Sequence, residues 1–267
     1  MKKLSIFAAV LAAVAFTACG GNKSAQPAEE ADSLKSFEQE QVEAKIKMEL
    51  DSLASEVGKL KSLPIVQSGE NGVQLTAEEK QVKPDYLLAP SVAEDATTLA
   101  EKYRILSALS VDKAVANLYE MPIAEYEQAI SKLAADINDP SFKAIDDTST
   151  IFETGQKLYD AMEENGRINY YWQLVASSLV EEIYVITQNT EKFITAFDDD
   201  AAANVTFRIV LLSDAVSRLA EYDPEFAPVA KAVEALSPLN AISVDQLKAQ
   251  LEESKEKIAE ARAELMK

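Results

Sequence analysis

The stretch that decides the fold is residues 167–188, which read RINYYWQLVASSLVEEIYVITQ. It contains no glycine or proline, and apolar side chains cover most of its circumference when it is drawn as a helix. The large apolar residues are Ile168, Tyr171, Trp172, Val175, Leu179, Ile183 and Ile186. Just before the stretch, Asn165 and Gly166 are the residue types that end a preceding helix in a left-handed conformation. The stretch therefore predicts a central helix that is buried on most sides.

A polar line runs along the same predicted helix at four-residue intervals, through Asn169, Gln173, Ser177 and Glu181. Residues four apart lie on one face of a helix. A narrow solvent-facing stripe is the favoured interpretation, because most polar stripes form the wet face of a helix. The alternative is a polar groove or ligand pocket with Glu181 or Glu182 at its base.

The chain on either side of this helix is also helical in pattern. Glycine occurs only seven times, and no sustained alternation of β-branched residues predicts strands. We expect an all-α fold, a multi-helix bundle of about eight or nine helices that forms a single domain over residues 33–267. The predicted helices cover roughly 33–63, 91–119, 122–138, 150–164, 167–188, 190–197, 201–222, 224–236 and 243–267.

The two ends of the domain carry long heptad-patterned helices. In the N-terminal helix, apolar residues recur at alternating intervals of four and three positions, as in a coiled-coil seam: Ile46, Leu50, Leu53, Val57 and Leu60. In the C-terminal helix, a heptad spacing follows a capping box of Ser243 and Gln246, at Val244, Leu247, Leu251, Ser254, Ile258, Ala261 and Leu265. Each seam needs a partner, which is the other seam, the rest of the core or a second protein.

The N-terminus has the organisation of a secretion signal. Lys2 and Lys3 precede an apolar run over residues 6–16, which is too short to span a bilayer as a permanent helix. The single cysteine of the chain, Cys19, follows. The segment 16–19, Phe-Thr-Ala-Cys, resembles the lipobox of bacterial lipoproteins, although Phe16 stands where an aliphatic residue is usual. The resemblance implies a signal peptide over residues 1–18 and a lipidated Cys19.

The residues after Cys19 predict how the domain is held. Residues 19–32 contain no apolar side chain larger than alanine apart from the cysteine itself, so they form a flexible tether. The membrane is then the partner that the lipid on Cys19 engages. Some two-membrane bacteria retain lipoproteins in the inner membrane through an aspartate after the cysteine, and Gly20 occupies that position here. We therefore expect an outer-membrane protein that faces the periplasm.

Two further stretches, residues 99–138 and 158–188, resemble an uncharacterised family of all-helical envelope lipoproteins. The residues that carry this resemblance are the run 103–109, Tyr119, the run 181–184 and the pair 187–188. The resemblance implies a helical fold and an envelope location. It implies no activity, substrate or catalytic residue.

The composition excludes several classes of function. The chain has 267 residues, 45 acidic and 26 basic side chains, a net charge of −19 and no histidine. A histidine-based triad and a histidine-ligated metal site are therefore excluded, and a single cysteine forms no internal disulfide. The negative charge repels phosphate backbones, so nucleic acid is not an expected partner. We expect no catalytic residue, metal or cofactor.

The candidate ligand-binding residues lie at the start of the central helix. Adjacent helical positions point about 100° apart, so Tyr170, Tyr171 and Trp172 cannot all face one core. The ring that does not face the core, together with the neighbouring Gln173, would give the aromatic wall and the polar group that ligand pockets show. Arg167 biases this predicted pocket toward anions.

Two arginines inside apolar helices are further candidates. Arg104 lies between Tyr103 and Ile105, and Arg208 lies between Phe207 and Ile209. A structural role is the favoured interpretation, either in ion pairs, with Glu181 and Glu182 as candidate partners, or as side chains that snorkel to the surface. An arginine-lined anion site is the alternative. Similarly, the run 198–200 of three aspartates is interpreted as a helix N-cap rather than a calcium site.

These observations predict a lipid-anchored cell-envelope protein with a non-catalytic binding or structural role. One alternative is a subunit that docks onto another envelope protein through its terminal helices. Another is a hydrolase that uses only carboxylates, since paired acids at a suitable separation can cleave glycosidic bonds. The ligand, if there is one, is an unidentified small molecule.

Overall fold

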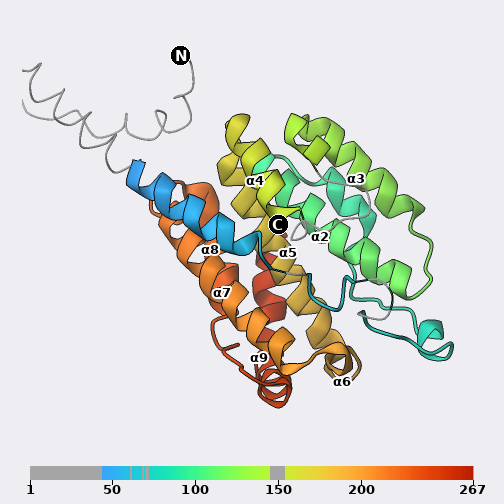
Figure 1. The fold of residues 1–267 in the computed structure, drawn as a ribbon. Coiled ribbons are helices and arrows are strands. Elements are labelled where there is room, and N and C mark those ends of the chain that lie inside the picture. Colours follow the sequence, from blue (N-terminus) through green and yellow to red (C-terminus); the bar gives the residue numbers. More distant parts are fainter. Residues whose placement is uncertain (1–43, 61, 68, 70–71, 145–153, 267) are drawn as a thin grey trace, which may run out of the picture.

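The computed structural model describes residues 44–266, except for 61, 68, 70–71 and 145–153. The predicted signal peptide, tether and lipidated Cys19 lie outside the described residues. Within them the chain forms helices joined by turns and loops and contains no strand, which confirms the all-α prediction (Figure 1). None of the described helices combines the length and the apolar run needed to cross a bilayer.

The described chain opens with a helix over residues 44–57. The later α-helices are α2 (Leu99–Leu118), α3 (Ala124–Ile137), α4 (Gly155–Glu164), α5 (Ile168–Gln188), α6 (Thr190–Phe193), α7 (Asp199–Ala220), α8 (Ala227–Ala235) and α9 (Val244–Leu265). Short 3-10 helices join them: η2 (Glu79–Gln81), η3 (Pro90–Glu94), η4 (Pro140–Ala144), η5 (Ile194–Ala196) and η6 (Pro224–Phe226).

Helix α5 is the centre of the bundle, as its apolar circumference predicts. Every residue from 171 to 183 is buried. On one side α5 packs against α2, which in turn carries α3, and on the other it packs against α7, α8 and α9 (Figure 1). An amphipathic helix needs one neighbour, whereas a helix that is apolar nearly all round must be enclosed.

Capping residues set several helix starts where the sequence places them. Asp198 accepts a hydrogen bond from the backbone N–H of Ala201 at 2.8 Å, so the aspartate run caps α7. Ser243 caps α9, with its hydroxyl facing the N–H of Gln246 at 3.5 Å. Gly166, between α4 and α5, has φ +67°, which suits a residue without a Cβ.

The predicted start of α2 at residue 91 is wrong. Residues 90–94 form only the 3-10 helix η3, and α2 begins at Leu99. Ser91 and Glu94 have the spacing of a capping box and predict the earlier start, but no side chain caps η3. The box that forms is a second one, in which Thr98 accepts from the N–H of Glu101 at 3.2 Å and Glu101 accepts from the N–H of Thr98 at 2.9 Å. Two boxes of similar sequence stand in series, and the later one starts the long helix.

The first helix is also shorter than predicted at its C-terminal end, because it stops at residue 57 rather than 63. Gly58 follows, where the backbone approaches α4 so closely that an added Cβ would lie 3.0 Å from the Cβ of Gln156. Glycine weakens a helix and allows this approach.

Both terminal seams are packed into the core. Leu50, Val57 and Leu60 are buried, whereas Leu53 is only half-buried and Ala54 takes the enclosed position beside it. The first helix is tied to α4 and α7, through Asp51, which accepts from the hydroxyl of Tyr159 at 2.6 Å, and through Glu49, which pairs with Arg218 at 2.6 Å. The seam of α9 packs on α5 and α8.

Leu251→Ala is expected to lower the free energy of unfolding by roughly 2–5 kcal/mol, because it removes a fully buried side chain from the seam of α9. Glu253→Ala, on the exposed face of the same helix, is the matched control and should change it by less than about 0.5 kcal/mol. Denaturant midpoints measure both. Equal midpoints for the two variants would show that the seam is not packed.

Candidate functional site

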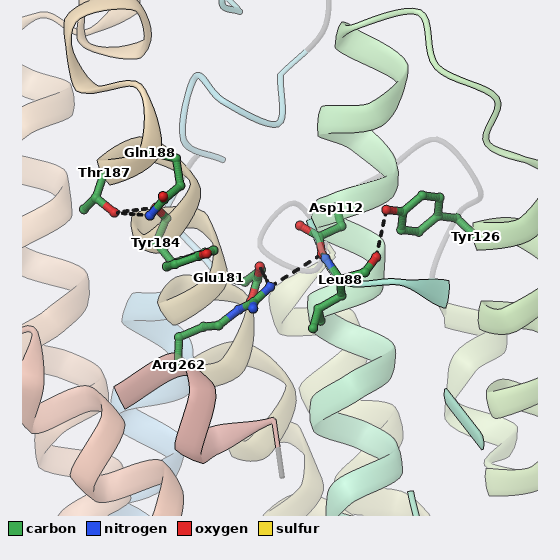
Figure 2. A network of polar contacts seen from close by, with 8 residues as sticks. All are labelled: Leu88, Asp112, Tyr126, Glu181, Tyr184, Thr187, Gln188 and Arg262. Carbon is green, nitrogen blue, oxygen red and sulfur yellow. Dashed lines mark hydrogen bonds and ion pairs between the residues drawn. The ribbon is translucent and has the colours of Figure 1, made fainter. Parts of the chain in front are cut away.

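The densest charge cluster in the described interior joins three helices that are distant in sequence. Arg262 of α9 donates two hydrogen bonds to Glu181 of α5, from Nε to Oε2 at 2.8 Å and from Nη2 to Oε1 at 2.7 Å. The same Nη2 lies 3.9 Å from Oδ2 of Asp112 of α2 (Figure 2). Both carboxylates are 0% exposed. A bidentate guanidinium–carboxylate pair of this kind fixes geometry as well as charge.

A second layer of contacts closes the cluster, as Figure 2 shows. The backbone N–H of Leu88 donates to Oδ2 of Asp112 at 2.8 Å, and the hydroxyl of Tyr126 donates to the carbonyl of Leu88 at 2.9 Å. The guanidinium of Arg262 lies 4.4 Å from the centroid of the Tyr184 ring. This stacking adds a cation–π attraction in a largely desolvated position.

The electrostatics of the cluster are unbalanced, because two carboxylates face one guanidinium. Burial raises the pKa of Asp112 well above its usual range, and the neighbouring charge of Glu181 raises it further. The N–H of Leu88 and the charge of Arg262 act in the opposite direction on that pKa but are weaker. The cluster therefore holds two buried carboxylates against a single guanidinium.

Arg104, predicted to pair with Glu181 or Glu182, pairs with neither. It is buried, and its Nε donates to the carbonyl of Leu265 at 3.2 Å while Nη1 donates to Oε1 of Gln173 at 3.4 Å. The C-terminal end of a helix carries free carbonyls and a partial negative charge, which a guanidinium satisfies. Arg104 thus caps α9, and the prediction of a carboxylate partner is wrong for this residue.

Arg208 and Glu182 form a second buried pair of charges, between α7 and α5. Arg208 donates from Nε to Asn204 at 2.6 Å, and Glu182 accepts from the hydroxyl of Ser178 at 3.2 Å. Burial raises the pKa of Glu182 to about 7 although the charge of Arg208 opposes that shift. Burial also lowers the pKa of Arg208 to about 10, against the charge of Glu182. Glu182 is therefore a charge neighbour of Arg208, as the sequence suggests.

The polar line on α5 does not face solvent. Gln173, Ser177 and Glu181 are all buried. Gln173 accepts from Arg104 and donates to the carbonyl of Glu225 at 3.2 Å. The favoured interpretation of this line as a wet face is wrong beyond its half-buried first residue, Asn169, because α2 and α9 cover the line and supply the guanidinium groups that contact Gln173 and Glu181.

The aromatic triplet is divided between core and surface. Tyr171 and Trp172 are fully buried, with ring centroids 5.1 Å apart at an edge-to-face angle of 84°. Tyr170 is half-buried and stacks on Tyr103, with centroids 4.6 Å apart, while the guanidinium of Arg167 lies 5.7 Å from its centroid. The ligand site predicted here stays a prediction, and Tyr170 is its accessible ring.

A polar surface hollow of about 790 Å³ lies elsewhere, between the loop after the first helix and the start of α7. Lys59 and Gln74 border it from the loop, and Asp198, Asp200 and Asn204 border it from α7. No residue of α5 lines it. Within the described ranges, no group of three or more acidic, cysteine or histidine side chains is arranged to hold a metal ion.

Asp112 and Arg262 are site residues that the sequence reading missed. Asp112 occupies a core position of α2, spaced three and four residues from the buried Leu109 and Ala116. Arg262 similarly stands four residues after the buried Ile258. A charged residue at a core spacing was the signal that could have identified both, because such a residue must find an opposite charge inside.

Comparisons with known proteins give no match for this chain: no family model, no curated protein and no solved structure aligns with it significantly.

Proposed function

We propose that this protein is a lipid-anchored protein of the bacterial cell envelope, held in the outer membrane through Cys19 and facing the periplasm, whose helical domain has a non-catalytic binding or structural role. The anchor rests on the position of the lone cysteine, directly after a short apolar run and small residues. The location rests on Gly20 and on the resemblance to lipoproteins.

One observation carries the non-catalytic part of the proposal, namely the closure of the cluster formed by Asp112, Glu181 and Arg262. A general acid or base must come within hydrogen-bond reach of a substrate. Both carboxylates are fully buried; the two oxygens of Glu181 face Arg262, and Oδ2 of Asp112 accepts from the backbone N–H of Leu88. The strongest acid–base constellation in the described residues is therefore engaged in joining helices, which supports a structural role for it.

The packing of the two terminal seams bears on the alternative of docking through the terminal helices. Leu50, Val57, Leu251 and Ile258 are buried inside the domain, so these seams are not available to a second protein. A partner that docks on another face remains within the proposed binding role. A carboxylate-dependent hydrolase would need a different pair of acids, on an accessible face.

Cys19→Ser is expected to abolish lipidation and to move the protein from the membrane pellet to the soluble fraction, because two or three acyl chains provide the attachment. Labelling of cells with an alkyne fatty acid, followed by sedimentation, measures both effects. Ser24→Ala, in the same tether, is the control and should behave like the wild type. A Cys19→Ser protein that still sediments with membranes would contradict the anchor.

Glu181→Gln tests the non-catalytic role in a strain whose own copy of the gene is deleted. If Glu181 has a structural role, each variant should restore envelope integrity according to the amount of folded protein alone. Leu251→Ala, a core variant that touches no acid, should then fall on the same curve as Glu181→Gln. Quantitative immunoblotting measures the amount of protein and detergent sensitivity measures envelope integrity, and the two together give that curve. Loss of restoration by Glu181→Gln at an unchanged amount of folded protein would instead indicate acid–base chemistry.

A further inference from the structure

The cluster at the α2–α5–α9 junction encloses more negative charge than it can neutralise. Glu181 uses both oxygens on Arg262, whereas Asp112 approaches the same guanidinium only at 3.9 Å. An isolated ionised carboxylate in a protein interior is so costly that the group usually takes up a proton. One of the two acids is therefore expected to be neutral.

The groups around Asp112 come from every element packed on this part of α2. Helix α5 contributes Glu181 and Tyr184, α9 contributes Arg262, and α3 contributes Tyr126. The segment before η3 contributes the N–H of Leu88 and the phenol of Tyr86, whose pKa is raised by its burial and, more weakly, by the charge of Asp112. Asp85 adds a further negative charge near Tyr184. Arg262 is thus the one cation among the described groups that face Asp112.

The two oxygens of Asp112 differ in their contacts. Oδ2 accepts from the N–H of Leu88 and is the oxygen nearest to Arg262. Oδ1 is buried and has no hydrogen-bond partner among the described residues. A protonated carboxyl keeps an acceptor oxygen and gains an O–H donor. The neighbouring carboxylate of Glu181 is an acceptor for that O–H, and its hydrogen bond with Asp112 favours the protonated form of Asp112.

We propose that Asp112 is a neutral carboxylic acid in the folded protein at neutral pH, and that this stored proton makes the docking of α9 onto α2 and α5 dependent on pH. With the proton present, Glu181 and Arg262 form a balanced pair and α9 is held. Without it, the closed junction carries one uncompensated negative charge, which opposes the docked position of α9.

The direction of the pH effect follows from the raised pKa of Asp112. A folded state that holds a proton more tightly than the unfolded chain is stabilised below the unfolded pKa and loses that stability as the pH rises through the folded pKa. The unfolding equilibrium should therefore shift toward the unfolded state as the pH rises from the usual range of a carboxyl pKa toward the raised pKa of Asp112. The steepest shift contributed by one proton approaches tenfold per pH unit.

Infrared difference spectroscopy of the full domain tests the protonation state directly. The spectrum of the wild type minus that of Asp112→Asn at neutral pH should contain the carbonyl stretch of a protonated carboxyl group. Glu182 is a second buried acid, so its own carbonyl band must be excluded as the source of the signal. Glu182→Gln is the matched control that excludes it. A difference spectrum that contains only carboxylate bands would overturn the proposal.

A second variant keeps the test decisive if Asp112→Asn does not fold. In Glu181→Gln, Asp112 is the sole carboxylate beside Arg262 and should ionise, so the acid band of Asp112 should disappear. Persistence of that band would overturn the coupling between the two acids. For the folded Asp112→Asn protein, the unfolding midpoint should lose the share of its pH dependence that Asp112 contributes, and an unchanged dependence would overturn the effect on α9 docking.

Discussion

Arg262→Ala is expected to lower the free energy of unfolding by roughly 3–5 kcal/mol, since it leaves Glu181 buried without its cation and removes the stacking on Tyr184. Much of this cost is the desolvated carboxylate that remains, rather than the lost attraction itself. Urea unfolding followed by circular dichroism measures the change. The expected loss is a large fraction of the total stability of a typical domain.

Arg218→Ala is the matched control for this prediction. Arg218 also bridges two acids, Glu49 at 2.6 Å and Asp214 at 3.0 Å, but its side chain is 38% exposed. Exposed ion pairs contribute about 0–1 kcal/mol, so this variant should unfold close to the wild type. Adding Glu181→Gln to a variant with Arg262→Met should recover part of the loss, because it removes the unpaired charge. Equal losses for Arg262→Ala and Arg218→Ala would contradict the role assigned to the cluster.

Trp172→Ala is expected to cost about 3–5 kcal/mol, the usual range for truncating a large buried aromatic side chain. Trp172 is fully buried, and its ring lies edge-to-face with Tyr159 at 6.2 Å and with Tyr171 at 5.1 Å. Phe207→Ala, which truncates a ring that is 44% exposed on α7, is the control. Thermal unfolding followed in the far ultraviolet compares them without relying on tryptophan emission.

The emission of Trp172 gives an independent check on the same region, because it is the single tryptophan of the chain. A fully buried indole should emit at short wavelength and resist a soluble quencher. Titration with candidate ligands should leave this emission unchanged unless they bind through Tyr170, which adjoins Trp172 in the chain and is half-buried. A wild-type protein whose emission is readily quenched would contradict the enclosed position of Trp172.

The parts of the fold that local sequence determines were predictable. Helix α5 follows from its continuous apolar circumference, and the starts of α7 and α9 follow from caps at Asp198 and Ser243, which satisfy amides of the same helix. The start of α2 was predicted incorrectly because two capping boxes lie close together, and local pattern does not rank them. In the structure the box at Thr98 is formed, whereas no side chain caps η3.

The candidate site was harder to predict, since its contacts join residues that no local pattern relates. Glu181 and Arg262 lie 81 positions apart, and Arg104 and Leu265 lie 161 positions apart. Periodicity shows that a charge occupies a buried face but does not say which charge on another helix meets it. Local pattern therefore predicts solvent for the polar line on α5, although α2 and α9 carry the guanidinium groups that contact Gln173 and Glu181.

The late position of α9 has a consequence for how the protein is made. Arg104 and Asp112 emerge from the ribosome long before Leu265 and Arg262, which complete their contacts. A nascent chain that lacks α9 keeps these charged groups hydrated and the apolar surface of α5 uncovered on one side. The core around α5 therefore closes only once α9, the last helix of the described chain, has been synthesised. The contacts that α9 makes with α5 and α8 are thus among the last that the chain can form during synthesis.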